Sequence, residues 1–405
     1  MLSVAEATER ILRAFSPLPG ETVALDAALG RVLCEPVISR VTQPPAAVSA
    51  MDGYAVRAGD VAALPARLAV VMSIAAGAAP TRAVGPGEAA RIFTGAPLPQ
   101  GTDTIVIQEN CAREGDFVIV REGSANPGQH VRAAGLDFKT GEIGLPAGHR
   151  LTARDIALAA AMNWPMLDVH RRPRIAILST GDELVPPGAT PGPAQIVASN
   201  GIGLAAFVTA CGAEPLHLGI APDNRADLGR AIDGALGCDL LITSGGASVG
   251  EHDLVQEVLA AKGMELDFWK IAMRPGKPLL FGSLGEMRIL GLPGNPVSAQ
   301  VTAALFVRPS IERMSGLPTK GSMTRTVRLG ADLKANDQRQ DYLRAKLGTG
   351  PDGESVATPY SKQDSAMLSL IARADALIVR PPFAPPARAG DKAEIVPLEG
   401  GCLSI

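Results

Sequence analysis

Apolar segments alternate with helical patterns between residues 174 and 315, and this alternation limits the possible folds most strongly. Strands are predicted at Arg174–Ser179, Leu216–Ile220, Asp239–Thr243 and Arg288–Leu292, and helices at Asn200–Cys211, Asp227–Leu236, His252–Ala261 and from Pro296 towards Met314. Apolar strands that alternate with helices form a mostly parallel sheet covered on both faces. The sequence therefore predicts a central doubly wound α/β domain.

The regions on either side have a different pattern. Between Val37 and Gly148, short β-like segments alternate with turns rich in Gly and Pro, which indicates a β-rich N-terminal lobe. Short β segments return after Gly316 and predict a C-terminal β domain. Ser3 and Glu6 have the spacing of a capping box, so a helix is expected to begin at Ser3, and a second helix is expected at Leu151–Trp164.

The chain has 405 residues, which is enough for several domains. We expect four: a helical linking domain (residues 1–40 and 141–172), the β-rich lobe (41–140), the α/β domain (173–320) and the C-terminal β domain (321–405). The formal net charge of −3 argues against a general nucleic-acid binder, which would carry a basic stripe. The five cysteines are scattered without a CxxC pair, which favours neither a zinc site nor a disulfide framework. No signal-peptide pattern or long apolar run is found, so a cytoplasmic protein without a membrane partner is expected.

Candidate site residues lie in the loops that follow the predicted strands. Ligands of open α/β sheets bind beyond the carboxyl ends of the strands. The four loops at those ends are Thr180–Glu183, Ala221–Asn224, Ser244–Gly250 and Pro293–Pro296, and they are expected to converge on one edge. The third loop offers backbone amides and a helix N-terminus suited to phosphate, although glycines also serve ordinary connecting turns. Its candidate binding residues are Ser244, Gly245, Gly246, Ser248 and Gly250.

Charged residues near these loops suggest a metal site and an anion site. Glu183, Asp223 and Asp253 could meet in one cleft and hold Mg²⁺ together with substrate phosphates, although each could instead cap a helix. A second group, Lys270, Arg274 and Lys277, lies between aromatic and apolar residues on a segment broken by Pro-Gly. Binding of an oxyanion explains these cations better than a solvated surface does.

Six motifs in order along the chain resemble those of the molybdopterin molybdenumtransferase family, which includes bacterial MoeA proteins and the E domain of gephyrin. They are SAMDGYAV, IFTGAPLP, STGDEL, TSGGASVGEHD, MRPGKP and GLPGNPVSA, from Ser49 to Ala299. The resemblance implies insertion of molybdenum from molybdate into the dithiolene of adenylylated molybdopterin, with release of AMP and assistance from Mg²⁺. It also implies a homodimer, with the linking domain in dimerisation, and transient contact with the molybdopterin adenylyltransferase. The site would lie between the α/β molybdopterin-binding domain of one subunit and the β-rich lobe of the other.

The same resemblance assigns roles to individual residues. From the lobe it implies Asp52, Thr94, Arg132 and Asp137, and from the α/β domain Glu183, Asp223, Asp253, Lys270, Arg274 and Lys277. Ser298, Arg344 and Ser365 would contact the small oxyanion. Several bacterial members carry Lys where Arg274 stands, and the stretch around Ser365 matches the family pattern imperfectly.

Two other functions fit parts of the sequence. Adenylyl transfer to molybdopterin uses a domain that resembles the region around Thr180 and Thr243–Gly250, but it would not need the lobe or the C-terminal β domain. A gephyrin-like scaffold that binds a receptor peptide would be expected to carry an additional fused domain and linker.

Overall fold

The structure is a computed structural model that describes residues 1–123, 126–245 and 254–398. The chain forms two compact units. The first contains residues 1–35, 147–156 and those from 166 onwards, and the second contains residues 36–146 and 157–165.

The first unit is built around a six-stranded sheet with the order β16-β13-β17-β21-β20-β18. Four parallel strands match the four predicted ones: β13 (Arg174–Thr180), β16 (Glu214–Ala221), β17 (Leu240–Ser244) and β21 (Met287–Leu292). Two antiparallel strands, β20 (Pro278–Leu284) and β18 (Glu265–Lys270), extend one edge. The sequence prediction did not include these two strands, because their pairing is set by the neighbouring strands.

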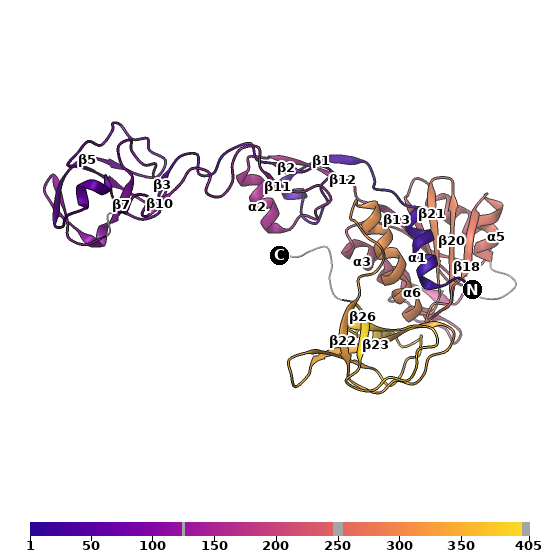
Figure 1. Ribbon diagram of the computed structural model, residues 1–405. Coiled ribbons are helices and arrows are strands. Elements are labelled where there is room, and N and C mark those ends of the chain that lie inside the picture. The colour runs from indigo at the N-terminus through magenta and orange to yellow at the C-terminus, as the bar shows by residue number, and fades with distance from the viewer. Residues whose placement is uncertain (124–125, 246–253, 399–405) are drawn as a thin grey trace. The chain divides into compact units, whose positions relative to one another are not determined.

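Helices cover both faces of this sheet, and successive strand residues alternate between the faces. Ile175 and Ile177 pack in one core with α1, α3, α6, η4 and α7, whereas Ala176 and Leu178 pack in another with α4 and α5. Figure 1 shows α3 and α5 on opposite sides of the strands. The helices are α1 (Val4–Arg13), α3 (Asn200–Ala210), α4 (Arg225–Asp233), α5 (Leu254–Ala261), α6 (Pro296–Thr302), the π-helix η4 (Ala303–Val307) and α7 (Arg308–Met314). The doubly wound α/β domain is therefore confirmed, and the long helix predicted from Pro296 is α6, η4 and α7 in succession.

Two predicted helix starts are confirmed by reciprocal hydrogen bonds. Ser3 Oγ accepts from Glu6 N at 3.2 Å, while Glu6 Oε2 accepts from Ser3 N at 2.9 Å, which is a capping box. Thr152 and Asp155 make the same exchange ahead of α2 (Ala153–Ala161). The chain between these helices includes β1 (Gly20–Ala24), which pairs with β12 (Met166–His170).

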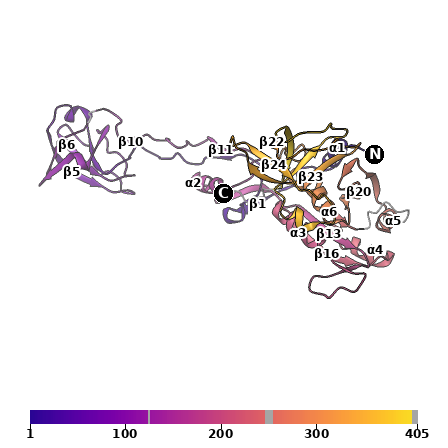
Figure 2. The ribbon, with the colours of Figure 1, turned by 90° about the horizontal axis from the view of Figure 1, so that it is seen from below.

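The C-terminal β domain has a second six-stranded sheet in the first unit, with the order β19-β23-β24-β22-β26-β25. Its strands are β22 (Arg325–Leu329), β23 (Gln340–Thr349), β24 (Ser355–Pro359), β25 (Ala376–Arg380), β26 (Lys392–Pro397) and the short β19 (Met273–Arg274). Figure 2 shows β22, β24 and β23 side by side. The predicted β domain is confirmed, and the short helix α8 (Leu368–Ile371) lies in the chain between β24 and β25.

The second unit confirms the β-rich lobe. Its sheet has the order β7-β4-β6-β5-β9-β8, formed by β4 (Gly53–Val56), β5 (Ala66–Ile74), β6 (Glu88–Ile92), β7 (Thr104–Ile107), β8 (Cys111–Glu114) and β9 (Phe117–Val120). Two strand pairs accompany it, β3 (Val48–Ser49) with β10 (Val131–Arg132) and β2 (Val37–Ile38) with β11 (Ile143–Leu145). At Gly53 a Cβ atom would lie 2.0 Å from the carbonyl oxygen of Val106, so only glycine fits beside β7.

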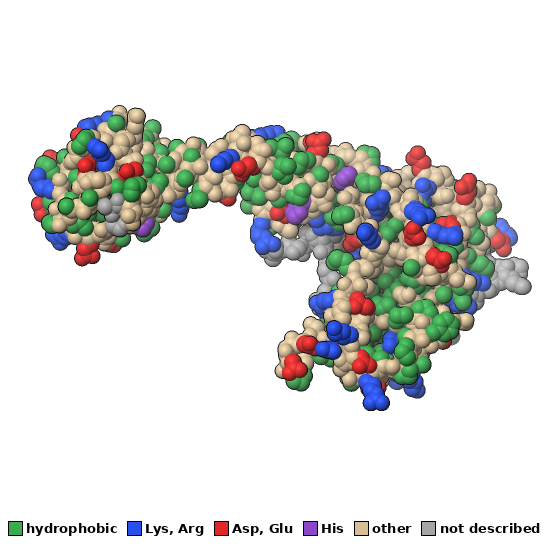
Figure 3. Space-filling view, viewed as in Figure 1, with side chains coloured by type: hydrophobic (Ala, Val, Ile, Leu, Met, Phe, Trp, Pro, Cys, Tyr) green, Lys and Arg blue, Asp and Glu red, His purple; other side chains and the backbone are tan. Residues whose placement is uncertain are grey.

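The remaining short elements are η1 (Leu25–Ala27), η2 (Ala58–Val61), η3 (Gln108–Asn110), β14 (Leu184–Val185) and β15 (Ile196–Val197). Within the described residues, no helix is long and apolar enough to cross a membrane. On the face seen in Figure 3, basic and acidic side chains are interspersed, in keeping with the small net charge.

Candidate functional site

A cavity of about 880 Å³ opens at the carboxyl ends of the parallel strands. All four predicted loops contribute to its lining, so their convergence is confirmed. Five predicted site residues line the cavity: Glu183, Asp223, Ser244, Gly245 and Lys277. Leu184, Ile196 and Val197 of the β14–β15 pair add an apolar part to the wall.

Glycine lets the loops approach one another closely at the floor of this cavity. Gly245 has a φ of +97°, and a Cβ atom there would lie 2.4 Å from the carbonyl oxygen of Thr180. At Gly294 a Cβ atom would lie 3.5 Å from the Cα atom of Gly245. Bare backbone is therefore packed against bare backbone where β13, β17 and β21 end, and a side chain at residue 245 would separate these loops.

Asn200, the first residue of α3, ties two of these loops together. Its Nδ2 donates to Ser244 Oγ at 2.9 Å and to the carbonyl oxygen of Gly294 at 2.7 Å. From the sequence, Asn200 is predicted only as the start of a helix. A polar residue at a helix start near strand ends was the available signal, but its two partners lie 44 and 94 residues away in the chain.

Acidic side chains gather at one side of the cavity. The backbone N–H of Asp223 donates to Asp182 Oδ1 at 3.0 Å. Burial, followed by the negative charges of Asp182 and Glu183, raises the pKa of Asp223. Clustered carboxylates of this kind are stabilised by a cation.

The predicted metal ligands are only partly described. Asp253 lies outside the described residues, as do Gly246, Ser248 and Gly250. Among the residues that are described, no group of three acidic, histidine or cysteine side chains has an arrangement that could hold a metal ion. Glu183 and Asp223 are nevertheless two oxygen ligands on one cavity. This set fits Mg²⁺, which usually takes one or two carboxylates and completes its shell with water and substrate phosphates.

The three predicted cations lie in different surroundings. Lys277 is exposed and lines the cavity. Lys270, at the end of β18, has its Nζ 3.9 Å from the ring centroid of Trp269. Arg274 forms ion pairs with Asp341 and, at 3.3 Å, with Asp337. The structure therefore brings Lys277 to the cavity, while Lys270 and Arg274 lie outside its lining and their binding roles remain predictions.

The residues predicted to contact a small oxyanion are outside the lining of the cavity. Ser298 is buried in α6. Arg344 is also buried, which lowers its pKa, and it donates from Nε to Gln363 Oε1 at 3.1 Å and from Nη1 to the carbonyl oxygen of Asp364 at 2.7 Å. Ser365 Oγ accepts from Asn295 Nδ2 at 3.1 Å. Arg344 thus holds the segment that precedes the cavity-lining Ala366, and direct contact with an oxyanion remains a prediction.

The β-rich lobe carries the other predicted residues. Asp52 Oδ1 accepts from the backbone N–H of Thr94 at 2.7 Å and from Thr94 Oγ1 at 2.8 Å. These two hydrogen bonds lower the pKa of Asp52, so its carboxylate stays ionised. Arg132 and Asp137 line a groove of about 580 Å³ in the same unit. The lobe therefore brings Asp52 to Thr94 and Arg132 to Asp137.

Replacing Thr94 with valine is expected to raise the pKa of Asp52 part of the way towards its ordinary value. The hydroxyl donor is lost, whereas the backbone N–H of residue 94 remains. A titration of the Asp52 carboxyl carbon by NMR measures this shift. Thr102→Val is the matched control, because Thr102 Oγ1 donates to the carbonyl oxygen of Pro99 instead. An unchanged pKa in Thr94→Val would contradict the role of the hydroxyl.

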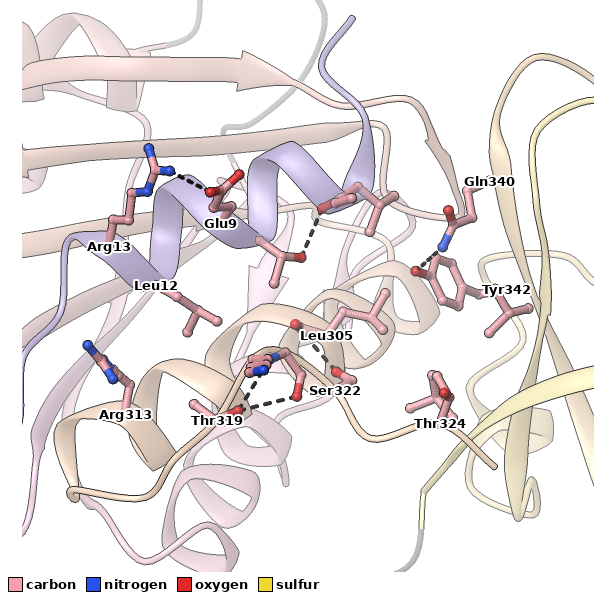
Figure 4. A pocket seen from close by; sticks show the side chains of 17 residues that line it. Glu9, Leu12, Arg13, Leu305, Arg313, Thr319, Ser322, Thr324, Gln340 and Tyr342 are labelled. Atoms are coloured by element: carbon pink, nitrogen blue, oxygen red, sulfur yellow. Dashed lines mark hydrogen bonds and ion pairs between the residues drawn. The ribbon is translucent and has the colours of Figure 1, made fainter. Parts of the chain in front are cut away.

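A second cavity of about 610 Å³ in the first unit lies between α1 and the C-terminal β domain. Figure 4 shows Leu12 of α1 and Tyr342 of β23 on opposite sides of it. Gln340 Nε2 lies 2.6 Å from the hydroxyl oxygen of Tyr342. None of the predicted site residues lines this cavity, so the chemistry is assigned to the cavity at the strand ends.

Comparison with known proteins places the chain in a family. Residues 2–163 match the MoeA N-terminal region (domain I and II), residues 176–313 a probable molybdopterin binding domain, and residues 326–398 the MoeA C-terminal region (domain IV). The molybdopterin molybdenumtransferase of Nostoc sp. is 41% identical over 371 residues, which cover 89% of this chain and 85% of that protein. The chain belongs to the molybdopterin molybdenumtransferase family.

Other members of the molybdopterin molybdenumtransferase family agree with this assignment. The Haemophilus influenzae protein of that name is 34% identical over 391 residues, which cover 94% of each chain. A solved structure of the molybdopterin biosynthesis MoeA protein from Pyrococcus horikoshii has a TM-score of 0.84 at 31% identity, and covers 99% of this chain and 100% of its own. The similarity thus extends over all the predicted domains.

Proposed function

We propose that this chain is a molybdopterin molybdenumtransferase, which inserts molybdenum from molybdate into adenylylated molybdopterin and releases AMP. The observation that carries the proposal is the cavity at the strand ends, where a glycine floor, two carboxylates and Lys277 come together. Family membership supports the same reaction. Both substrates are anionic, since molybdate is a dianion and adenylylated molybdopterin carries a phosphoanhydride.

Each part of the cavity has a task in this reaction. Gly245 and Gly294 line the cavity without side chains, so phosphates would be able to approach the backbone there, and Lys277 would supply positive charge to an oxyanion. Glu183 and Asp223 would hold Mg²⁺ beside the phosphoanhydride. When bound, Mg²⁺ offsets the charge that develops on the leaving AMP. The dithiolene sulfurs belong to the substrate, so no catalytic cysteine is needed.

We further propose that the active form is a homodimer, in which the Asp52–Thr94 pair of one subunit completes the cavity of the other. The pair lies in a different unit from the cavity, and a two-fold axis would give two such composite sites. The adenylylated substrate must come from an adenylyl-transfer reaction, so transient contact with a molybdopterin adenylyltransferase is part of the proposal. A cytoplasmic location is supported by Cys34, Cys111 and Cys238, which are thiols rather than disulfides.

The test is AMP release by the purified protein. Adenylylated molybdopterin, Mg²⁺ and molybdate are supplied together, and AMP is separated and measured by chromatography. We expect release to depend on molybdate, and sulfate, another tetrahedral dianion, serves as the control. Release that is independent of molybdate would contradict the proposal. Formation of adenylylated molybdopterin from molybdopterin and ATP would instead identify the adenylyltransferase, and tight binding of a receptor peptide without turnover would identify a scaffold.

A further inference from the structure

We propose that Asn200 is a positioning residue that directs the hydroxyl hydrogen of Ser244 towards an anionic oxygen of the substrate. This inference rests on the proposed function and adds a defined contact within that site. The chemical group recognised is a tetrahedral oxyanion, which is either a phosphate of adenylylated molybdopterin or molybdate itself.

The orientation of the Asn200 side chain follows from its partners. The carbonyl oxygen of Gly294 can only accept a hydrogen bond, so the atom of Asn200 that lies 2.7 Å from it is the amide nitrogen. The same nitrogen lies 2.9 Å from Ser244 Oγ. Both amide hydrogens are therefore used, one by each loop, and the amide orientation is fixed.

The orientation of Ser244 follows in turn. An amide nitrogen donates and does not accept, so Ser244 Oγ is the acceptor of this bond. Its own hydrogen must then point away from Asn200. Ser244 is only 2% exposed, and it lines the cavity at the end of β17. The side-chain hydrogen bond that the structure describes for Ser244 is the one it accepts from Asn200, and we infer that its own hydrogen is directed to a ligand in the cavity.

The surroundings indicate why this ligand oxygen is anionic. Gly245 follows Ser244 directly and forms the glycine floor, while Lys277 lines the same cavity. A hydroxyl that donates to a charged oxygen makes a stronger bond than one that donates to a neutral oxygen. Asn200 thus makes Ser244 a donor in advance of binding, and no reorientation is needed when the substrate arrives.

The variant Asn200→Asp tests this arrangement, because it keeps the size of the side chain and reverses its polarity. A carboxylate would accept the Ser244 hydrogen and would face the Gly294 carbonyl oxygen unfavourably. We expect the KM of one oxyanion substrate to rise by at least about tenfold, the ordinary effect of losing a hydrogen bond to a charged group. A rise confined to adenylylated molybdopterin assigns the contact to a phosphate, and a rise confined to molybdate assigns it to molybdate.

A double-mutant cycle separates positioning from a general structural effect. If Asn200 acts through the hydroxyl, Asn200→Asp should add little to KM in a Ser244→Ala background. Asp239→Asn is the matched control. It weakens the ion pair at the other end of β17, in which Asp239 accepts hydrogen bonds from Arg171 Nη1 at 2.8 Å and Nη2 at 2.6 Å. This control should lower the melting temperature without raising either KM.

Two results would overturn the inference: an unchanged KM in Asn200→Asp, or equal and additive effects in both backgrounds. The dissociation constants of AMP and of molybdate, measured by calorimetry for the same variants, give a second readout that does not need turnover. A wild-type protein without molybdate-dependent AMP release would refute the proposed function. The calorimetric comparison would still decide whether Asn200 and Ser244 act together on an oxyanion.

Discussion

Replacing Asp223 with alanine is expected to reduce molybdate-dependent AMP release by at least about a hundredfold, an ordinary loss for a catalytic group. Asp223 lies on the cavity with Glu183, and its pKa is raised by burial and then by repulsion from Asp182 and Glu183. A bound cation is expected to offset that repulsion. The variant should therefore also need more Mg²⁺ for half of its maximal rate, which a Mg²⁺ titration of AMP release measures.

Asp227→Ala is the matched control for this experiment. Asp227 is an acidic residue four positions later, and it pairs with Arg230 in the first turn of α4 outside the cavity lining. Its replacement should leave the rate close to that of the wild type. If Asp223→Ala keeps a third or more of the rate, or needs no additional Mg²⁺, Asp223 is not a ligand of the cation.

Mixed dimers are expected to show that each site uses two subunits. Asp52→Ala and Asp223→Ala homodimers should each be nearly inactive. A heterodimer of the two, purified with a different affinity tag on each subunit, should recover about half of the wild-type activity, because one of its two composite sites is intact.

The reciprocal heterodimer provides the control. It combines a wild-type subunit with a subunit that carries both substitutions, and it should be nearly inactive, because each composite site then contains one substitution. A site within a single subunit predicts the opposite pair of results, about half activity here and none in the first heterodimer. If no heterodimer can be isolated, the homodimer proposal itself is wrong.

The sequence predicted the site best where the positions of the loops follow from the direction of the strands. Parallel strands end at the same edge, so the loops after β13, β16, β17 and β21 were expected to meet, and the cavity contains all of them. Local signals were equally reliable for helix starts, as the Ser3–Glu6 capping box shows. The capping box depends on residues three positions apart, and the meeting of the loops depends only on the order and direction of the strands.

Features that depend on distant partners were not predictable in this way. The two hydrogen bonds that Asn200 donates could be predicted only with knowledge of where Ser244 and Gly294 lie in space. Burial of Arg344 and its hydrogen bonds to residues 363 and 364 also depend on tertiary packing. The antiparallel strands β18 and β20 were missed because their pairing is set by neighbouring strands rather than by a strict alternation of apolar residues.

The short strand β19 has a consequence for the order in which the protein matures. Met273 and Arg274 leave the α/β domain and pair with residues 340 and 341, which are synthesised 67 positions later. Arg274 also takes its ion-pair partners, Asp337 and Asp341, from that later region. A nascent chain that has emerged only as far as α7 lacks the strand partners of Met273 and Arg274 and the ion-pair partners of Arg274. The pairing that completes β19 therefore forms only after the chain has been synthesised to residue 341, well beyond the end of the α/β domain.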